Sequence, residues 1–145
     1  MQIQMDVAAL NAFVVAEFPQ VADDFRVEEV TPEGLVMRLL VAERHLRPGG
    51  TVSGPAIFGL ADVAIYLAIL SRIGPVALAV TTSANLDFLR KPAAGVDLRA
   101  EVRILKLGRV LAVAEALIYS DGQGAPVARA AMTYSIPPES RGKNG

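Results

Sequence analysis

The chain has 145 residues, of which 52% are hydrophobic, 14 are Lys or Arg and 15 are Asp or Glu. This length suits one domain, and we expect a single domain over residues 1–145 with its core at about 20–137. A net charge of −1 gives the whole chain no attraction for nucleic acid or for an anionic membrane. The lack of cysteine excludes disulfides and thiolate metal sites, and one histidine provides little for a zinc site.

The first third of the chain predicts a short helix followed by a hairpin. Residues 1–6 lack the basic and apolar regions of a secretory signal, so we expect a cytoplasmic protein. Apolar residues at helical spacing before Pro19 predict an amphipathic helix: Val7, Leu10, Phe13, Val14 and Phe18. Residues 24–30 and 34–42 are strand-like and flank a turn that contains Pro32 and Gly34.

Residues 54–71 form an apolar helical run whose only charged residue is Asp62. Gly54 and Pro55 suit its start, and Gly74 followed by Pro75 suits its end. The run 55–70 is shorter than the roughly 20 residues of a membrane span and carries a carboxylate, so we interpret it as a buried helix of a soluble protein.

Asp62 is the first candidate for chemistry, because an unpaired carboxylate in apolar surroundings costs several kcal/mol or has a raised pKa. A sequence keeps such a group only where it has a partner or a task. The structural alternative is pairing with a hydroxyl or a backbone N–H of a second subunit.

The second half of the chain changes to a period of two, which predicts four strands. In the first, over 80–88, we place Val80, Ala84, Leu86 and Phe88 on one face. Residues 97–106 alternate cleanly between apolar and polar, and residues 126–136 form the last strand. The third strand, 109–119, is apolar on both faces apart from Glu115, so we expect it to be central in the sheet. The tail after Pro137 is predicted to fray.

This order of elements predicts an α+β domain in which an antiparallel sheet wraps around one long central helix. One sheet cannot cover all sides of a helix that is apolar all round. A second copy of the chain is the natural cover, so we expect a homodimer or a dimer of dimers.

Three stretches resemble the hotdog-fold thioesterases, in particular the phenylacetate-degradation type that hydrolyses acyl-coenzyme A (acyl-CoA). Residues 50–64 are similar to the family's His-Gly-Gly loop followed by a helix with Leu-x-Asp, here Leu60, Ala61 and Asp62. Residues 86–92 and 106–109 resemble its strand and hairpin signatures, and the resemblance spans roughly residues 25–136.

The resemblance implies that Asp62 acts as general base or nucleophile and that the Gly54 N–H polarises the thioester carbonyl. A helix N-terminus suits a developing oxyanion, because its free N–H groups and its dipole favour negative charge. The chain departs from the family at Ser53, which replaces a histidine, and near Arg47 or Pro48, where many members have asparagine. Ser53 is either a ligand-binding hydroxyl or simply the N-cap of the helix.

Other candidates contact the substrate by the same resemblance. Thr81, Thr82 and Ser83 lie on the strand that approaches the helix from across the dimer, where a hydroxyl could orient Asp62 or a water; the alternative is ordinary strand residues. Four cations near strand ends could meet the CoA phosphates, or be ordinary surface charge. These are Arg90, Lys91, Lys106 and Arg109.

The remaining polar and aromatic candidates are assigned no chemistry. We expect His45 to be exposed in a loop, and Tyr66 and Phe58 to be core or pocket wall.

We therefore predict a thioester hydrolase acting on a small or aryl acyl-CoA, with no metal and no cofactor. The rival hypothesis is a non-catalytic hotdog protein that binds acyl-CoA or serves in an assembly, which the loss of the histidine favours. A hotdog dehydratase is a weaker third reading, because those enzymes use a catalytic histidine and His45 lies outside the helix start.

Overall fold

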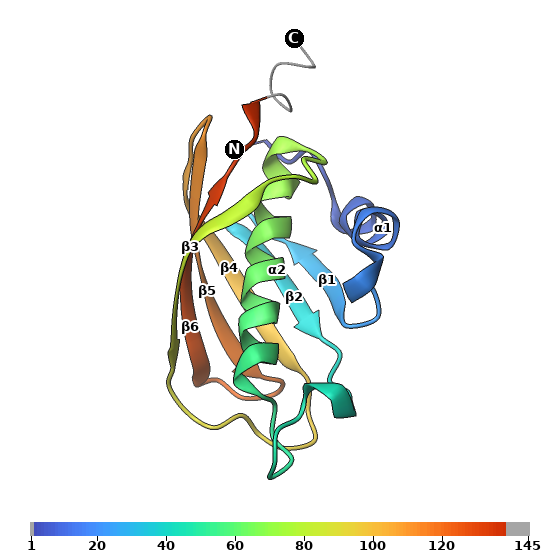
Figure 1. Ribbon diagram of the computed structural model, residues 1–145, viewed down its shortest axis with the longest axis vertical. Helices are drawn as coiled ribbons and strands as arrows, with labels where there is room; N and C mark the ends of the chain where they lie inside the picture. Colours follow the sequence, from blue (N-terminus) through green and yellow to red (C-terminus); the bar gives the residue numbers. More distant parts are fainter. Residues whose placement is uncertain (1, 139–145) are drawn as a thin grey trace.

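A computed structural model describes residues 2–138 and shows two α-helices packed on a six-stranded antiparallel sheet (Figure 1). The helices are α1 (Val7–Glu17) and α2 (Gly54–Ile73), with short 3-10 helices η1 (Pro19–Val21) and η2 (Glu43–His45). The strands are β1 (Phe25–Val30), β2 (Gly34–Leu39), β3 (Val80–Phe88), β4 (Leu98–Leu107), β5 (Leu111–Ser120) and β6 (Pro126–Ser135). The predicted tail lies largely in 139–145, outside the described residues.

The sheet has the strand order β1-β2-β4-β5-β6-β3 and curves around α2, which runs along its concave face (Figure 1). This is the hotdog arrangement that the sequence predicts. β5 lies inside the sheet, as its two apolar faces indicate.

Local signals define both ends of α2. The Ser53 hydroxyl accepts a hydrogen bond from the Ala56 N–H, and Pro55 occupies the first turn. Gly74 ends the helix with φ of +92°, a conformation that residues with a side chain rarely adopt. α2 is the one described helix that is long and apolar enough to cross a membrane, but most of it is buried against the sheet, as expected of a core helix.

The core lies between α2 and the concave face of the sheet. The alternation of β4 is as predicted, since Leu98, Ala100 and Val102 are buried while Glu101 and Arg103 are exposed. The buried positions on β5 are largely alanines, which let the sheet approach the helix closely.

The two edges of the sheet differ in their surroundings. At the β1 edge, Asn11 of α1 donates from Nδ2 to the Val27 carbonyl (3.1 Å) and accepts from the Val27 N–H at Oδ1 (2.9 Å). At the β3 edge, Val80 and Phe88 are 55% and 58% exposed. The described residues therefore cover one edge and leave the other open.

The predicted face of β3 is wrong at its start. A bulge between Thr81 and Ser83 shifts the pairing with β6, so Thr81 lies opposite Tyr134 and faces α2 in the place that simple alternation gives to Thr82, and Val80 pairs with Ser135 instead of sharing that face. Ala84, Leu86 and Phe88 follow on that face as expected.

The predicted exposure of His45 is also wrong, because only 7% of this residue is exposed. Its Nδ1 accepts from the Ala42 N–H (2.9 Å) and its Nε2 lies 3.2 Å from Asp24 Oδ1. Its carbonyl accepts from the Ser53 N–H (2.8 Å), so His45 anchors the loop that leads into α2. The three-residue helix η2 turns the His45 side chain inward. The polar residues around His45 predict only a loop, so its burial could not be foreseen from the sequence.

Candidate active site

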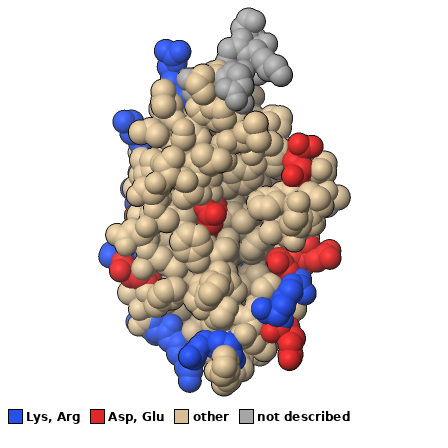
Figure 2. Space-filling view, viewed as in Figure 1, with Lys and Arg blue, Asp and Glu red and all other residues tan. Residues whose placement is uncertain are grey.

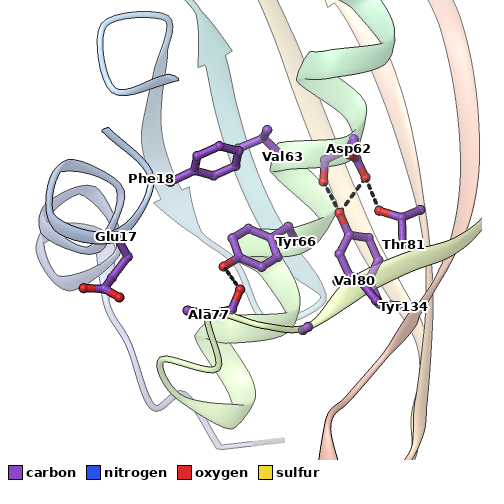
Figure 3. A pocket seen from close by; sticks show the side chains of 10 residues that line it. Glu17, Phe18, Asp62, Val63, Tyr66, Ala77, Val80, Thr81 and Tyr134 are labelled. Atoms are coloured by element: carbon purple, nitrogen blue, oxygen red, sulfur yellow. Dashed lines mark hydrogen bonds between the residues drawn. The ribbon is translucent and has the colours of Figure 1, made fainter. Parts of the chain in front are cut away.

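Asp62 lies in the middle of α2, half-buried, where it lines a cavity of about 390 Å³ (Figure 3). The cavity opens to the surface and is bounded by the end of α1, by α2, by the start of β3 and by the end of β6. Its lining residues are Glu17, Phe18, Asp62, Val63, Tyr66, Ala77, Ala79, Val80, Thr81 and Tyr134. The carboxylate that sequence analysis singles out is thus open to a cavity rather than sealed in the core.

Two hydroxyl groups hold one oxygen of this carboxylate. Thr81 Oγ1 donates to Asp62 Oδ1 at 2.6 Å, and the Tyr134 hydroxyl lies 2.5 Å from the same oxygen (Figure 3). The Tyr134 hydroxyl also lies 2.9 Å from the main-chain carbonyl of Asp62. Among residues 2–138 no donor is hydrogen-bonded to Oδ2.

Thr81 belongs to the same chain as the Asp62 that it contacts, whereas the resemblance implies an approach from across a dimer. The β-bulge is the reason, because it turns the Thr81 side chain onto the face of its own helix. The other two hydroxyls lie away from Asp62. Thr82 donates to the Thr133 carbonyl (3.3 Å), and Ser83 pairs with Thr133 on an exposed part of β3.

Tyr134 is a site residue that sequence reasoning missed. It is 3% exposed, and burial, followed by the charge of Asp62, raises the pKa of its phenol well above the usual value. One feature of the sequence points to it, because Tyr134 is the one hydroxyl on a strand face that otherwise carries Ala128, Ala130 and Met132. A buried phenol requires a hydrogen-bond partner, and Asp62 supplies it.

Aromatic rings form one wall of the cavity. The Tyr66 ring lies 6.0 Å from that of Tyr134 and 6.3 Å, edge-on, from that of Phe18. The Tyr66 hydroxyl donates to the Ala77 carbonyl (2.9 Å), and burial raises the pKa of Tyr66 to about 12. Tyr66 is therefore pocket wall, as expected, whereas Phe58 is 39% exposed on the uncovered side of α2.

Gly54 lies in a second cavity, of about 450 Å³, at the N-terminus of α2. Gly54 and Asp62 are eight positions apart in one helix, hence about 12 Å apart along its axis. One thioester carbonyl therefore cannot reach both groups of the same chain. The Gly54 N–H makes no hydrogen bond within the described part of the chain, and Pro55 has no N–H to offer.

Ser53 acts as the N-cap of α2 in this structure, with its hydroxyl 3.3 Å from the Ala56 nitrogen. This matches the structural alternative for Ser53; a role toward substrate stays a prediction.

The four candidate cations fall into two pairs at opposite ends of the sheet. Arg90 and Lys91 line the cavity of Gly54, together with Arg47, which lies near the position where many family members have asparagine. Lys106 and Arg109 are exposed at the β4–β5 hairpin, which lies level with the start of β3 but is separated from it by β6. Within one chain only the first pair adjoins the helix N-terminus.

The charge distribution follows this division. Figure 2 shows acidic atoms in the middle of the face and Lys or Arg side chains at its lower end, where α2 begins in Figure 1, with others at its upper left margin. Within residues 2–138 no three His, Cys, Asp or Glu side chains cluster as metal ligands do.

The antiparallel sheet wrapped around one central helix places the protein in the hotdog-fold class, and comparison with known proteins identifies the family. Residues 49–127 match the family model described as the thioesterase superfamily. The chain therefore belongs to the thioesterase superfamily.

Individual relatives agree with this assignment. A candidate esterase of Pseudomonas aeruginosa is 33% identical over 103 residues, which are 71% of this chain and 75% of that protein. The crystal structure of a candidate thioesterase from Silicibacter sp. TM1040 is 53% identical, with a TM-score of 0.89 over 95% of this chain and 96% of the other. A mutant of the phenylacetic acid degradation protein PaaI from Thermus thermophilus is 29% identical, with a TM-score of 0.70 over 82% and 99% of the two chains.

Proposed function

We propose that this protein hydrolyses acyl-CoA thioesters, with Asp62 as the reacting carboxylate. The observation that carries the proposal is the state of that carboxylate, which has one oxygen held by two hydroxyls and the other free beside a cavity. A purely structural carboxylate would have both oxygens satisfied inside the protein. Membership of the thioesterase superfamily supports the reaction class.

The site is completed by a second copy of the chain, because Gly54 and Asp62 of one helix lie too far apart to act on one carbonyl. β3 offers the place for that copy, as an open edge with exposed apolar side chains. Two β3 strands paired antiparallel about Ala84 would set Thr81 of one chain near Phe88 of the other. Gly54 lies against Phe88, since a Cβ on Gly54 would be 3.4 Å from its ring. The Gly54 N–H of one chain thus approaches Asp62 of the other.

In this arrangement the thioester carbonyl accepts a hydrogen bond from the Gly54 N–H while Asp62 Oδ2 faces the carbonyl carbon. Oδ2 takes a proton from a water molecule whose oxygen attacks that carbon. Negative charge develops on the carbonyl oxygen, where the helix N-terminus stabilises it. The C–S bond then breaks, and the leaving thiolate receives the proton from Oδ2. Direct attack by Oδ2, followed by hydrolysis of the resulting anhydride, gives the same products.

The two cavities suit the two ends of an acyl-CoA. The one around Asp62 is walled by Phe18, Tyr66 and Val63, which favours a small or aryl acyl group. The one around Gly54 carries Arg47, Arg90 and Lys91, whose charges complement the phosphates of CoA. Lys106 and Arg109 lie at the same end of the sheet as the start of β3, with β6 between. In the proposed antiparallel pairing this end faces Arg90 and Lys91 of the second chain, so their charges add.

The test is a hydrolysis screen with short, medium, long and aryl acyl-CoA substrates, read by release of free thiol. We expect turnover with small or aryl substrates, and its loss by at least about 100-fold in Asp62→Asn. Asp23→Asn is the matched control, because Asp23 is exposed in a turn away from the cavity. Equal turnover in Asp62→Asn and the parent protein would refute the role of Asp62.

A single-turnover reaction in ¹⁸O-labelled water separates the two routes. Direct attack places labelled oxygen in the Asp62 side chain when water opens the anhydride at the Asp62 carboxyl carbon, whereas activation of water never labels that carboxylate, so label in Asp62 establishes direct attack.

A non-catalytic acyl-CoA-binding protein is the second candidate, favoured by one observation. Ser53 stands where the family pattern has a histidine, and its hydroxyl serves as a helix cap. Unchanged acyl-CoA affinity in Asp62→Asn, with no turnover of any substrate by the parent protein, would establish this alternative.

A further inference from the structure

Three residues from three different elements meet at one carboxylate oxygen. Asp62 lies on α2, Thr81 at the start of β3 and Tyr134 at the end of β6. Both hydroxyls approach Oδ1, at 2.6 and 2.5 Å, and both contacts have the short distances of charge-assisted hydrogen bonds. The two oxygens of the carboxylate are therefore not equivalent.

The proton of Tyr134 has two acceptors within reach, the Oδ1 atom and the main-chain carbonyl of Asp62. A phenol carries one proton, and an ionised carboxylate is a stronger acceptor than a neutral carbonyl. The shorter distance, 2.5 Å against 2.9 Å, agrees with donation to Oδ1.

Tyr134 is also a rigid donor. Its side chain is almost fully buried, and its ring packs at 6.0 Å against Tyr66, whose own hydroxyl is tied to Ala77. Because burial raises the pKa of the Tyr134 phenol, the group keeps its proton through the neutral range. Thr81, by contrast, lies half-buried on an edge strand.

We propose that Tyr134 is a positioning residue. Together with Thr81 it holds Oδ1 of Asp62 in hydrogen bonds within the protein and so directs Oδ2 toward the substrate. This inference rests on the proposed thioesterase function. Without the phenol, Thr81 alone of the two hydroxyls holds Oδ1, so the carboxylate rotates more freely about χ2 and Oδ2 is aimed into the cavity for less of the time. A misplacement of about 1 Å at a reacting group costs about 100-fold in rate.

The decisive experiment compares Tyr134→Phe with the parent protein on the best substrate of the screen. We expect kcat to fall by about 10- to 100-fold while KM stays within about threefold, because the phenol acts on the carboxylate and not on the bound acyl group. Tyr119→Phe is the matched control. Tyr119 faces the other side of the sheet, with the Arg99 guanidinium 5.6 Å from its ring, and its loss should leave both constants unchanged.

A second pair of variants keeps the test decisive if Tyr134→Phe does not fold. Thr81→Val removes the other donor to Oδ1, and Thr81→Ser restores it. We expect Val to lower kcat by about tenfold and Ser to recover it, a difference that a merely structural role would not produce. In Tyr134→Phe/Thr81→Val, the losses should not add, since both donors act on one atom.

The proposal is overturned if Tyr134→Phe keeps kcat within twofold, or raises KM with kcat unchanged, while Asp62→Asn is inactive. That outcome leaves the thioesterase function standing. Lack of turnover by the parent protein refutes the thioesterase function itself, so the two failures are distinguishable.

Discussion

The sheet ends at β1 on one side and at β3 on the other, and the described residues cover only the first of these edges. At β1, the side-chain amide of Asn11 hydrogen-bonds to both the N–H and the carbonyl of Val27. These backbone groups are therefore not available to another strand. At β3, apolar side chains such as Val80 and Phe88 are exposed beside unpaired backbone. An uncovered apolar edge is a template for association. The chain thus closes one edge itself and leaves the other open, and the dimer proposed above pairs two chains through that open edge.

The largest effect should come from blocking the open edge. Ala84→Arg places like charges face to face at the centre of the proposed β3–β3 pairing, so we expect monomers and a loss of thioesterase turnover of about 100-fold or more. Sedimentation velocity and thiol release measure the two outcomes. Glu29→Arg, an exposed change on β1, is the control. A monomeric variant with full activity would break the link between the edge and the site.

The next effect concerns the two tyrosines that line the cavity beside that edge, Tyr66 and Tyr134. Both have a raised pKa and lose their protons at a higher pH than an unfolded tyrosine. Unfolded tyrosine ionises near pH 10, whereas burial raises the pKa of Tyr66 to about 12 and also raises that of Tyr134. Their contribution to folding is complete below pH 10 and is lost as the pH rises toward 12.

Urea unfolding across this range should show stability falling, and Tyr66→Phe/Tyr134→Phe should flatten the fall. With three tyrosines and no tryptophan, tyrosinate absorbance follows the same groups directly. Because the burial arises within one chain, Ala84→Arg should titrate like the parent protein. A shift of its tyrosines toward pH 10 would mean that the second copy closes the cavity.

A smaller effect is expected at the closed edge. Asn11→Ala removes two hydrogen bonds to β1, so we expect a loss of about 2 kcal/mol in the free energy of unfolding. Urea denaturation measures it, with exposed Ala12→Ser on the same helix as control. An unchanged free energy would show that α1 covers this edge without help from the amide.

The smallest effect is expected at the start of α2. Ser53→Ala removes the N-cap and should cost about 1 kcal/mol in the free energy of unfolding with kcat within about threefold. Urea denaturation and the thiol assay measure these quantities, and Gln123→Ala, exposed in the turn between β5 and β6, is the control. A large loss of kcat at unchanged stability would instead assign Ser53 to the reaction.

Several features followed from the sequence because they depend on neighbouring residues. The limits of α2 are encoded by Ser53, Pro55 and Gly74, and the strands by a period of two. The importance of Asp62 followed from the cost of one charge in an apolar helix. The central place of β5 followed from its two apolar faces.

The other features depend on segments that are far apart in the chain, and only the tertiary structure decided them. Tyr134 reaches Asp62 across 72 positions, and a single bulge turns Thr81 toward the helix. Asn11 hydrogen-bonds to the backbone of Val27 at the β1 edge, and the His45 side chain points inward and contacts Asp24. Strand pairing and burial determine these contacts, and neither local propensity nor periodicity contains the register that brings such residues together.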